Sequence, residues 1–73
     1  MMLTLPMTVR IWLATSATDL RKSFDTLAEV VRQQLHGDPL SGHLFVFRNK
    51  RADRIKLLYW DDDGFVIVYK KQV

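Results

Sequence analysis

The sequence predicts a small α+β domain in which one helix packs on a mainly antiparallel four-stranded sheet, in the order β-α-β-β-β. Three short segments rich in β-branched and aromatic residues, His43 to Arg48, Arg54 to Trp60 and Phe65 to Lys70, are separated by turn-forming residues, as strands are. Between Asp19 and His36 apolar residues recur every three or four positions, as in an amphipathic helix. The alternating segment Val9 to Leu13 supplies a fourth strand before the helix.

The first predicted strand has two different sides. Val9, Ile11 and Leu13 alternate with Arg10 and Trp12, so the two sets point in opposite directions. We expect the aliphatic set to face the helix. Residues 1 to 7 have no periodic pattern and contain a proline, so they are interpreted as a loose lead-in.

The predicted helix has one apolar stripe, formed by Leu20, Phe24, Leu27, Val31 and Leu35. Ser16 or Thr18 is expected to act as its N-cap, because a side-chain oxygen there can accept a backbone N–H of the first turn. Glu29 and Arg32 can form an ion pair on the exposed side. Gly37 is the expected left-handed residue after the last turn, and Pro39 prevents continuation.

Two turns join the last three strands, and they differ in kind. Asp61-Asp62-Asp63-Gly64 ends in Asp-Gly, a strong hairpin signal because both residues tolerate a positive φ. The segment Asn49 to Asp53 is a longer loop that contains two of the cations described below.

Length and composition indicate one domain over residues 1 to 73. A core of this size supplies only a few kcal/mol of net stability, so the domain is expected to gain from a partner. The chain has no cysteine, which excludes a disulfide framework and a thiolate zinc site and fits a reducing cytoplasm. No apolar run approaches a membrane span, and the first residues lack the features of a secretory signal, so an intracellular location without membrane insertion is expected.

The positive charge is concentrated in the last third of the chain. Residues 1–47 hold four cations and four acids, whereas residues 48–73 hold seven cations and four acids. Clustered cations are the usual electrostatic feature of a protein that binds a polyanion. The candidate nucleic-acid-binding residues are Arg48, Lys50, Arg51, Arg54 and Lys56. The alternative is that the loop is basic only because it is exposed to water.

One helix cannot cover both faces of four strands, so one sheet face is expected to remain uncovered. The aromatic residues of the strands are too numerous to be expected on the helix side alone. The candidates for a partner-binding face are Trp12, Phe45, Phe47, Trp60 and Tyr69. The alternative is that these are ordinary strand residues partly covered by the termini.

The sequence offers little support for a catalytic or metal site. Asp61, Asp62 and Asp63 are consecutive in a tight turn and cannot all point at one ion, and the rest of an EF-hand loop is absent. His36 and His43 have no evident third ligand and are interpreted as structural. No nucleophile motif and no phosphate-binding glycine loop occurs, so we expect no catalytic residue, no metal and no cofactor.

Three phrases carry a family resemblance: TDLRKSFD, SGHLFVFRNKR and RIKLLYWDDDGF. Over residues 8 to 71 the chain resembles the TnpB-type accessory proteins, the second-reading-frame products of bacterial insertion sequence family sixty-six. The resemblance implies a non-enzymatic role in DNA transposition in the bacterial cytoplasm, beside a separate transposase that carries the catalytic residues. Together with the loop cations and the uncovered sheet face, this role leads us to expect three partners: DNA, held weakly and mainly by its phosphates, the other transposition proteins of the element, and further copies of the chain.

Two departures from the family pattern stand out. Family members usually continue well beyond Lys70 and Lys71, so the resemblance implies a C-terminally truncated copy or a fragment. Relatives often have glycine in the basic loop where this chain has Ala52. The two leading hypotheses are a DNA-contacting accessory subunit and a protein-interaction module that bridges the other transposition proteins without binding DNA. An independent nuclease or transferase has little support.

Overall fold

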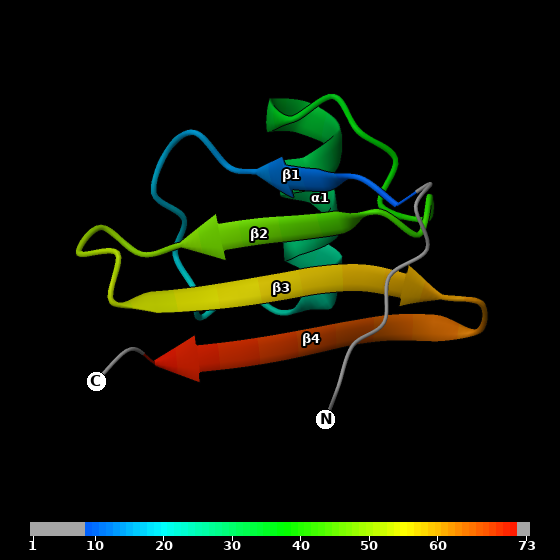
Figure 1. Ribbon diagram of the computed structural model, residues 1–73. Helices are drawn as coiled ribbons and strands as arrows, with labels where there is room; N and C mark the ends of the chain where they lie inside the picture. The colour runs from blue at the N-terminus through cyan, green and yellow to red at the C-terminus, as the bar shows by residue number, and fades with distance from the viewer. Residues whose placement is uncertain (1–8, 72–73) are drawn as a thin grey trace.

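The computed structural model describes residues 9–71, which form a four-stranded sheet with one helix on one of its faces (Figure 1). The elements are β1 (Ile11–Leu13), α1 (Phe24–Gln34), β2 (Leu44–Arg48), β3 (Arg54–Asp61) and β4 (Gly64–Lys71). The strands lie in the order β1-β2-β3-β4, with β1 parallel to β2 and the other pairs antiparallel. The predicted fold class is confirmed. The predicted lead-in over residues 1 to 7 lies outside the described residues.

The core lies between α1 and the middle of the sheet. Phe45, Phe47 and Leu58 are completely buried, as are Leu27 and Val31 from the facing side of the helix. The strand register explains this grouping, because Trp12, Phe45, Leu58 and Ile67 are successive neighbours across the four strands and therefore share one face. Burial of these large apolar side chains supplies most of the driving force for folding.

The predicted orientation of β1 is wrong. Ile11 and Leu13 are 59% and 67% exposed, whereas Trp12 packs against the core and stacks on Phe45 with ring centroids 6.2 Å apart. The pairing of Trp12 with Phe45 places both rings on the helix side. In so short a strand the larger aromatic surface takes the buried side, and the two aliphatic residues take the other.

The helix begins five residues later than predicted, and its N-cap is Ser23 rather than Ser16 or Thr18. Asp19 is the physical reason. Its carboxylate accepts the backbone N–H of Arg21 at 3.0 Å, and its carbonyl accepts the N–H of Lys22 at 3.2 Å, which forms a turn instead of a first helical turn. Leu20 remains buried from this turn, but Phe24, at the start of the helix, is 51% exposed and stacks on Phe65.

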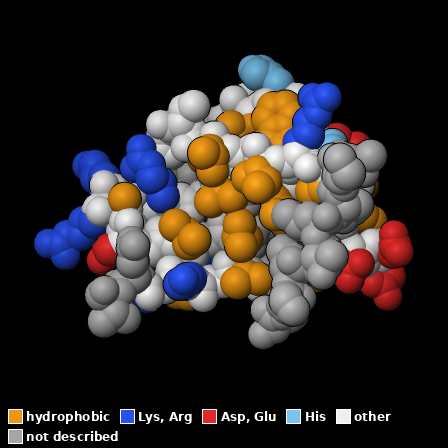
Figure 2. All heavy atoms as spheres, viewed as in Figure 1, with side chains coloured by type: hydrophobic (Ala, Val, Ile, Leu, Met, Phe, Trp, Pro, Cys, Tyr) orange, Lys and Arg blue, Asp and Glu red, His pale blue; other side chains and the backbone are white. Residues whose placement is uncertain are grey.

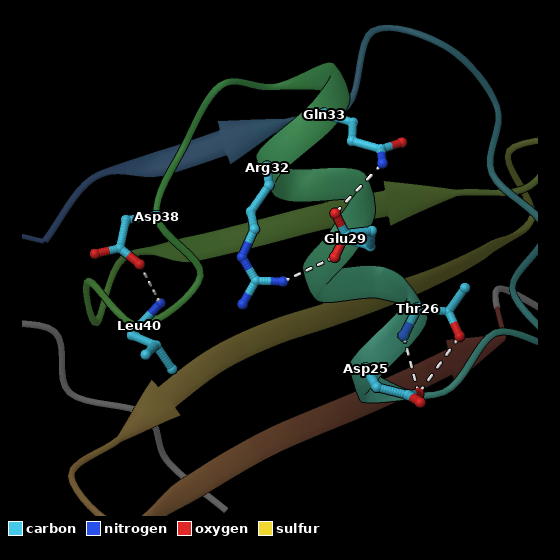
Figure 3. A network of polar contacts seen from close by, with 7 residues as sticks. All are labelled: Asp25, Thr26, Glu29, Arg32, Gln33, Asp38 and Leu40. Atoms are coloured by element: carbon cyan, nitrogen blue, oxygen red, sulfur yellow. Dashed lines mark hydrogen bonds and ion pairs between the residues drawn. The ribbon is translucent and has the colours of Figure 1, made fainter.

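The left-handed residue that follows the helix is His36 and not the predicted Gly37. His36 has the left-handed φ of 54°, and Gly37 donates its N–H to the carbonyl of Val31. Gly37 is needed for a different reason, since a Cβ there would lie 3.1 Å from the Phe45 ring. On the exposed side the predicted pair of Glu29 and Arg32 is confirmed at 3.0 Å (Figure 3).

The hairpin between β3 and β4 occurs where it was predicted, but its turn is one residue earlier. Asp61 pairs with Gly64, so the turn residues are Asp62 and Asp63, and Asp62 has a φ of 50°. Because β3 runs the length of the sheet from Arg54, this acidic turn lies at the opposite end of the sheet from the basic loop between β2 and β3 (Figures 1 and 2).

The second face of the sheet, which we call the open face, is mainly aliphatic in its middle. It has no helix on it, and Figure 2 shows hydrophobic side chains across its middle. Strand alternation assigns to it the uncharged residues Ile11, Leu13, Leu44, Val46, Ile55, Leu57, Tyr59, Val66 and Val68, with Arg48, Lys70 and Asp61 toward its ends. Ile11 and Leu13 are exposed, Leu44 is buried, and the other uncharged side chains are half-buried.

The burial pattern predicts that Phe47 and Phe24 differ in their contribution to stability. Phe47→Ala should cost about 3–5 kcal/mol, the usual range for emptying a buried aromatic site. Phe24→Ala should cost about half of that or less, because half of the ring is already in water. Urea unfolding followed by tryptophan fluorescence measures both values. Equal losses for the two variants would contradict the assigned core.

Candidate nucleic-acid interface

The loop between β2 and β3 is held in one shape by Asn49. Its side-chain oxygen accepts the backbone N–H of Arg54 at 3.1 Å, and its side-chain nitrogen donates to the carboxylate of Asp53 at 2.6 Å. The Asn49 carbonyl also accepts the N–H of Ala52 at 3.1 Å, which closes a β-turn. The Asn49 hydrogen bond, assisted by the charges of Arg54 and Arg51, lowers the pKa of Asp53 below its ordinary value. The cations of this loop therefore project from an ordered turn.

Ala52 adopts a left-handed conformation in this loop, with a φ of 58°. Residues with a Cβ disfavour that region because the Cβ approaches the following carbonyl oxygen. The Asn49 hydrogen bonds on both sides of Ala52 hold the turn in this conformation.

Lys56 contacts both the segment before the helix and the last strand. Its ammonium donates to the carbonyl of Lys22 at 3.1 Å and lies 5.4 Å from the centre of the Tyr69 ring. An ammonium has three N–H groups, so this hydrogen bond leaves two for other acceptors. Lys56 thus joins the segment before the helix to the end of the sheet and keeps capacity for an anion.

An open hollow of about 680 Å³ lies beside Lys56. The turn over residues 17–21 forms one wall, and the β2–β3 loop with the neighbouring ends of β3 and β4 forms the other. Its polar and charged lining residues are Thr18, Asp19, Arg21, Asn49, Lys50, Arg54, Lys56 and Tyr69. Lys50, Arg54 and Lys56 form no ion pair with any acid in residues 9–71.

Arg21 contributes less net charge to the hollow than the three other cations. Its guanidinium binds the Asp19 carboxylate in a bidentate manner, with the shortest contact at 2.9 Å. These hydrogen bonds and the charge of Arg21 lower the pKa of Asp19 from 3.8 to about 2. Asp19 is therefore ionised at neutral pH, and its charge offsets that of Arg21.

The five predicted nucleic-acid-binding residues are not all brought together. Lys50, Arg54 and Lys56 line the hollow, whereas Arg51 projects from the exposed part of the loop and does not line it. Arg48 pairs with Ile55 and lies on the open face, on the other side of the sheet from Lys56. The geometry thus selects three of the five as neighbours around one concave surface.

Comparison with known proteins places the chain in a family. A family model described as IS66 Orf2 like protein matches residues 9–72. The chain belongs to the IS66 Orf2-like family. Two curated relatives from Sinorhizobium fredii (strain NBRC 101917 / NGR234), both named as uncharacterized proteins, are each 40% identical. The match to y4jC covers 85% of this chain and 53% of the relative, and the match to y4hO covers 86% and 55%.

This IS66 Orf2-like chain therefore spans about half the length of the curated relatives it matches. No solved structure matches it significantly.

The five aromatic residues predicted as candidates for a partner face all lie on the helix side of the sheet. Phe45 and Phe47 are completely buried, and Trp12 packs against the core. Trp60 contacts Phe65 edge to face, and Tyr69 lies beside Lys56. The expectation that these rings cannot all lie on the helix side is wrong, because the strand register places every one of them there.

The acidic turn and the two histidines do not form a metal site. Within residues 9–71 no group of three or more His, Asp or Glu side chains is arranged to hold a metal ion. The Nδ1 atom of His43 accepts the backbone N–H of Arg10 at 3.0 Å, which is a structural contact at the start of β1. His36 ends the helix.

Sequence reasoning missed Asn49 and the turn at Asp19 as parts of this site. An asparagine at the end of a strand, followed by a basic segment and an aspartate, is a usable signal for a side-chain clamp across a turn. The approach of residues 17–21 to the loop has no local signal, because it depends on Thr18 donating its N–H to the Arg48 carbonyl at 2.8 Å.

Ala52→Gly should stabilise this IS66 Orf2-like chain. A left-handed residue with a Cβ costs about 1–2 kcal/mol, while glycine loses about 0.5–1 kcal/mol through extra backbone entropy, so a net gain of about 0.5–1 kcal/mol is expected. The gain corresponds to a rise in melting temperature of roughly 2–8 °C. The matched control is Ala17→Gly, an exposed loop alanine without a positive φ, which should lower the melting temperature. A fall in both variants would show that Ala52 is not strained.

Proposed function

We propose that this chain is an accessory protein of insertion-sequence DNA transposition that contacts the DNA backbone through the basic hollow and its loop. One observation carries the proposal: Lys50, Arg54 and Lys56 border one open hollow without an acidic ion-pair partner in residues 9–71. Arg51 extends the same basic surface from the loop, whereas Arg48 lies on the other side of the sheet and is not part of that surface. The protein is proposed to act in the bacterial cytoplasm, beside a separate transposase, without a catalytic role of its own.

The chemistry of the hollow suits phosphate groups. Lysine and arginine neutralise backbone phosphates and release condensed counterions, which supplies most of the affinity of non-specific DNA binding. Asn49 holds the loop against β3, so little ordering is needed when the cations meet the phosphates. Nothing in the hollow is shaped to fix a side chain against base edges, so sequence preference should be slight. Affinity in the micromolar range or weaker is expected at physiological salt.

A second candidate function is a bridge between the other transposition proteins of the element. The observation that favours it is the open face, where Ile11 and Leu13 are more than half exposed on the side away from the helix. In this model the basic loop serves only solubility. The bridging model predicts protein partners and no salt-dependent retention of DNA.

No helix within residues 9–71 is long and apolar enough to cross a bilayer.

The DNA-contact proposal is tested by fluorescence anisotropy of a labelled duplex titrated with the chain at several salt concentrations. Three to five phosphate contacts predict a slope of log affinity against log salt of roughly −3 to −4.5. The double variant Lys50→Glu with Arg54→Glu should weaken binding and reduce the magnitude of this slope by about 2, because each neutralised phosphate contributes about 0.9.

The matched control reverses two cations outside the hollow, Arg10→Glu with Arg32→Glu, and so changes the net charge by the same amount. We expect it to leave most of the affinity and of the slope unchanged. Absence of binding at low salt would favour the bridging module. Equal weakening by the two double variants would mean that only the net charge matters and that the hollow is not the contact.

A further inference from the structure

The open face has charged residues of opposite sign at its two ends. Ile55, Leu57, Tyr59 and Asp61 alternate along β3 and therefore share this face. Arg48 and Lys70 are the register partners of Ile55 on the two neighbouring strands, so both lie at the basic end. Asp61 lies at the other end, where it pairs with Gly64. In Figure 2 most of the lysine and arginine side chains gather toward the left of this face and most of the carboxylates toward the right, with hydrophobic side chains between them.

These end charges lack ion-pair partners within the described chain. The two ion pairs found in residues 9–71 are Arg21 with Asp19 and Arg32 with Glu29, both on or near the helix. Arg48, Lys70 and Asp61 are in neither pair. About six residues separate the two ends along β3, which corresponds to about 20 Å at the rise of a strand. The charges therefore cannot reach each other within one molecule.

We propose that the open face binds a second copy of this chain, with the two sheets packed face to face and their strands antiparallel. The two copies are related by a two-fold axis that lies in the plane of the interface and runs perpendicular to the strands. The axis passes midway between Leu57 and Tyr59, so Asp61 of one copy lies over Ile55 of the other. Arg48 and Lys70 of that other copy stand on either side of Ile55. Both ends of the interface then carry a carboxylate between two cations, and the aliphatic rows meet at the spacing of about 10 Å found between packed sheets.

The charge pattern selects this arrangement over its alternative. A two-fold axis along the strands would place Asp61 against Asp61 and the cations of one copy against those of the other, and such like-charge contacts are unfavourable. The size of the face is also sufficient. The two longer extents of the molecule are 30 and 29 Å, which leaves room for about 800 Å² per partner, the usual area of a stable interface.

This dimer is compatible with DNA binding and does not depend on it. Lys50, Arg54 and Lys56 border the hollow on the helix side of the sheet, away from the proposed interface. Because the strands run antiparallel, the two hollows would lie at opposite ends of the dimer and on its outer surfaces.

The test is the molar mass of the full 73-residue chain by sedimentation equilibrium, with a pair of charge-reversed variants. One variant is Asp61→Lys, and the other is Arg48→Glu with Lys70→Glu. The unaltered chain should be a dimer. Each variant alone places like charges at both ends, so its dissociation constant should rise at least tenfold. An equimolar mixture of the two has attractive contacts at both ends and should restore a heterodimer.

Restoration in the mixture also shows that both variants are folded. The substitution Leu57→Lys, in the centre of the face, should dissociate the dimer while circular dichroism retains the strand signal. A monomeric unaltered chain at high concentration would overturn the proposal. A dimer that survives all the charge reversals, as expected for pairing through the edge of β4, would overturn it too. A third outcome would also overturn the proposal: a full chain that is monomeric but dimerises once residues 1–8 are removed. In that case the chain's own first residues, and no second copy, would occupy the open face.

Discussion

The structure depends on the packing of one helix against one face of the sheet through Phe45 and Phe47. These rings, completely buried with Leu58, meet Leu27 and Val31 of the helix and fix which side of every strand is internal. Because the strand period is two, the choice made in β2 determines the orientation of β1, β3 and β4 through the register. At the end of the helix Gly37 leaves room for the Phe45 ring, because a Cβ there would lie 3.1 Å from it.

This constraint separates the charged residues of the last third of the chain into two groups. Lys56 and Arg54 share the helix side with Phe47 and Tyr69, so they meet the turn over residues 17–21 and form the hollow. Arg48 and Lys70 point to the open face with the aliphatic residues. A basic segment that is continuous in sequence is therefore divided between a concave surface suited to phosphates and a flat surface suited to another polypeptide.

Much of the fold could be predicted from periodicity, and the errors have local physical causes. The helix, the four strands and the positions of both turns follow from apolar spacing and turn chemistry. The helix start was placed too early because the Asp19 side chain competes for the backbone N–H of Arg21, which apolar spacing does not reveal. The side of β1 was misassigned because alternation gives two sets of residues and does not say which set is buried. Only the pairing of Trp12 with Phe45 determines that Trp12 takes the buried side of β1.

The candidate site was predictable in composition but not in arrangement. The loop cations are evident in the sequence, yet the separation of Arg48 from Lys56 requires the register of β2 and β3. Residues 17–21 form the other wall of the hollow. They approach the β2–β3 loop through backbone hydrogen bonds, which no pattern of side chains in the sequence reveals. The aromatic residues were expected on the uncovered face, but a small core needs its largest rings for burial, and the aliphatic residues remain outside.

We propose that the two sides of the sheet have different binding roles. This proposal is tested most directly by following the backbone amide signals of the isotope-labelled chain in solution during titration with a short DNA duplex. We expect shifts at residues 17–21, 49–54, Lys56 and Tyr69, with little change at Leu13, Val46 or Val68. Shifts concentrated on those open-face residues, or spread evenly over the molecule, would contradict it.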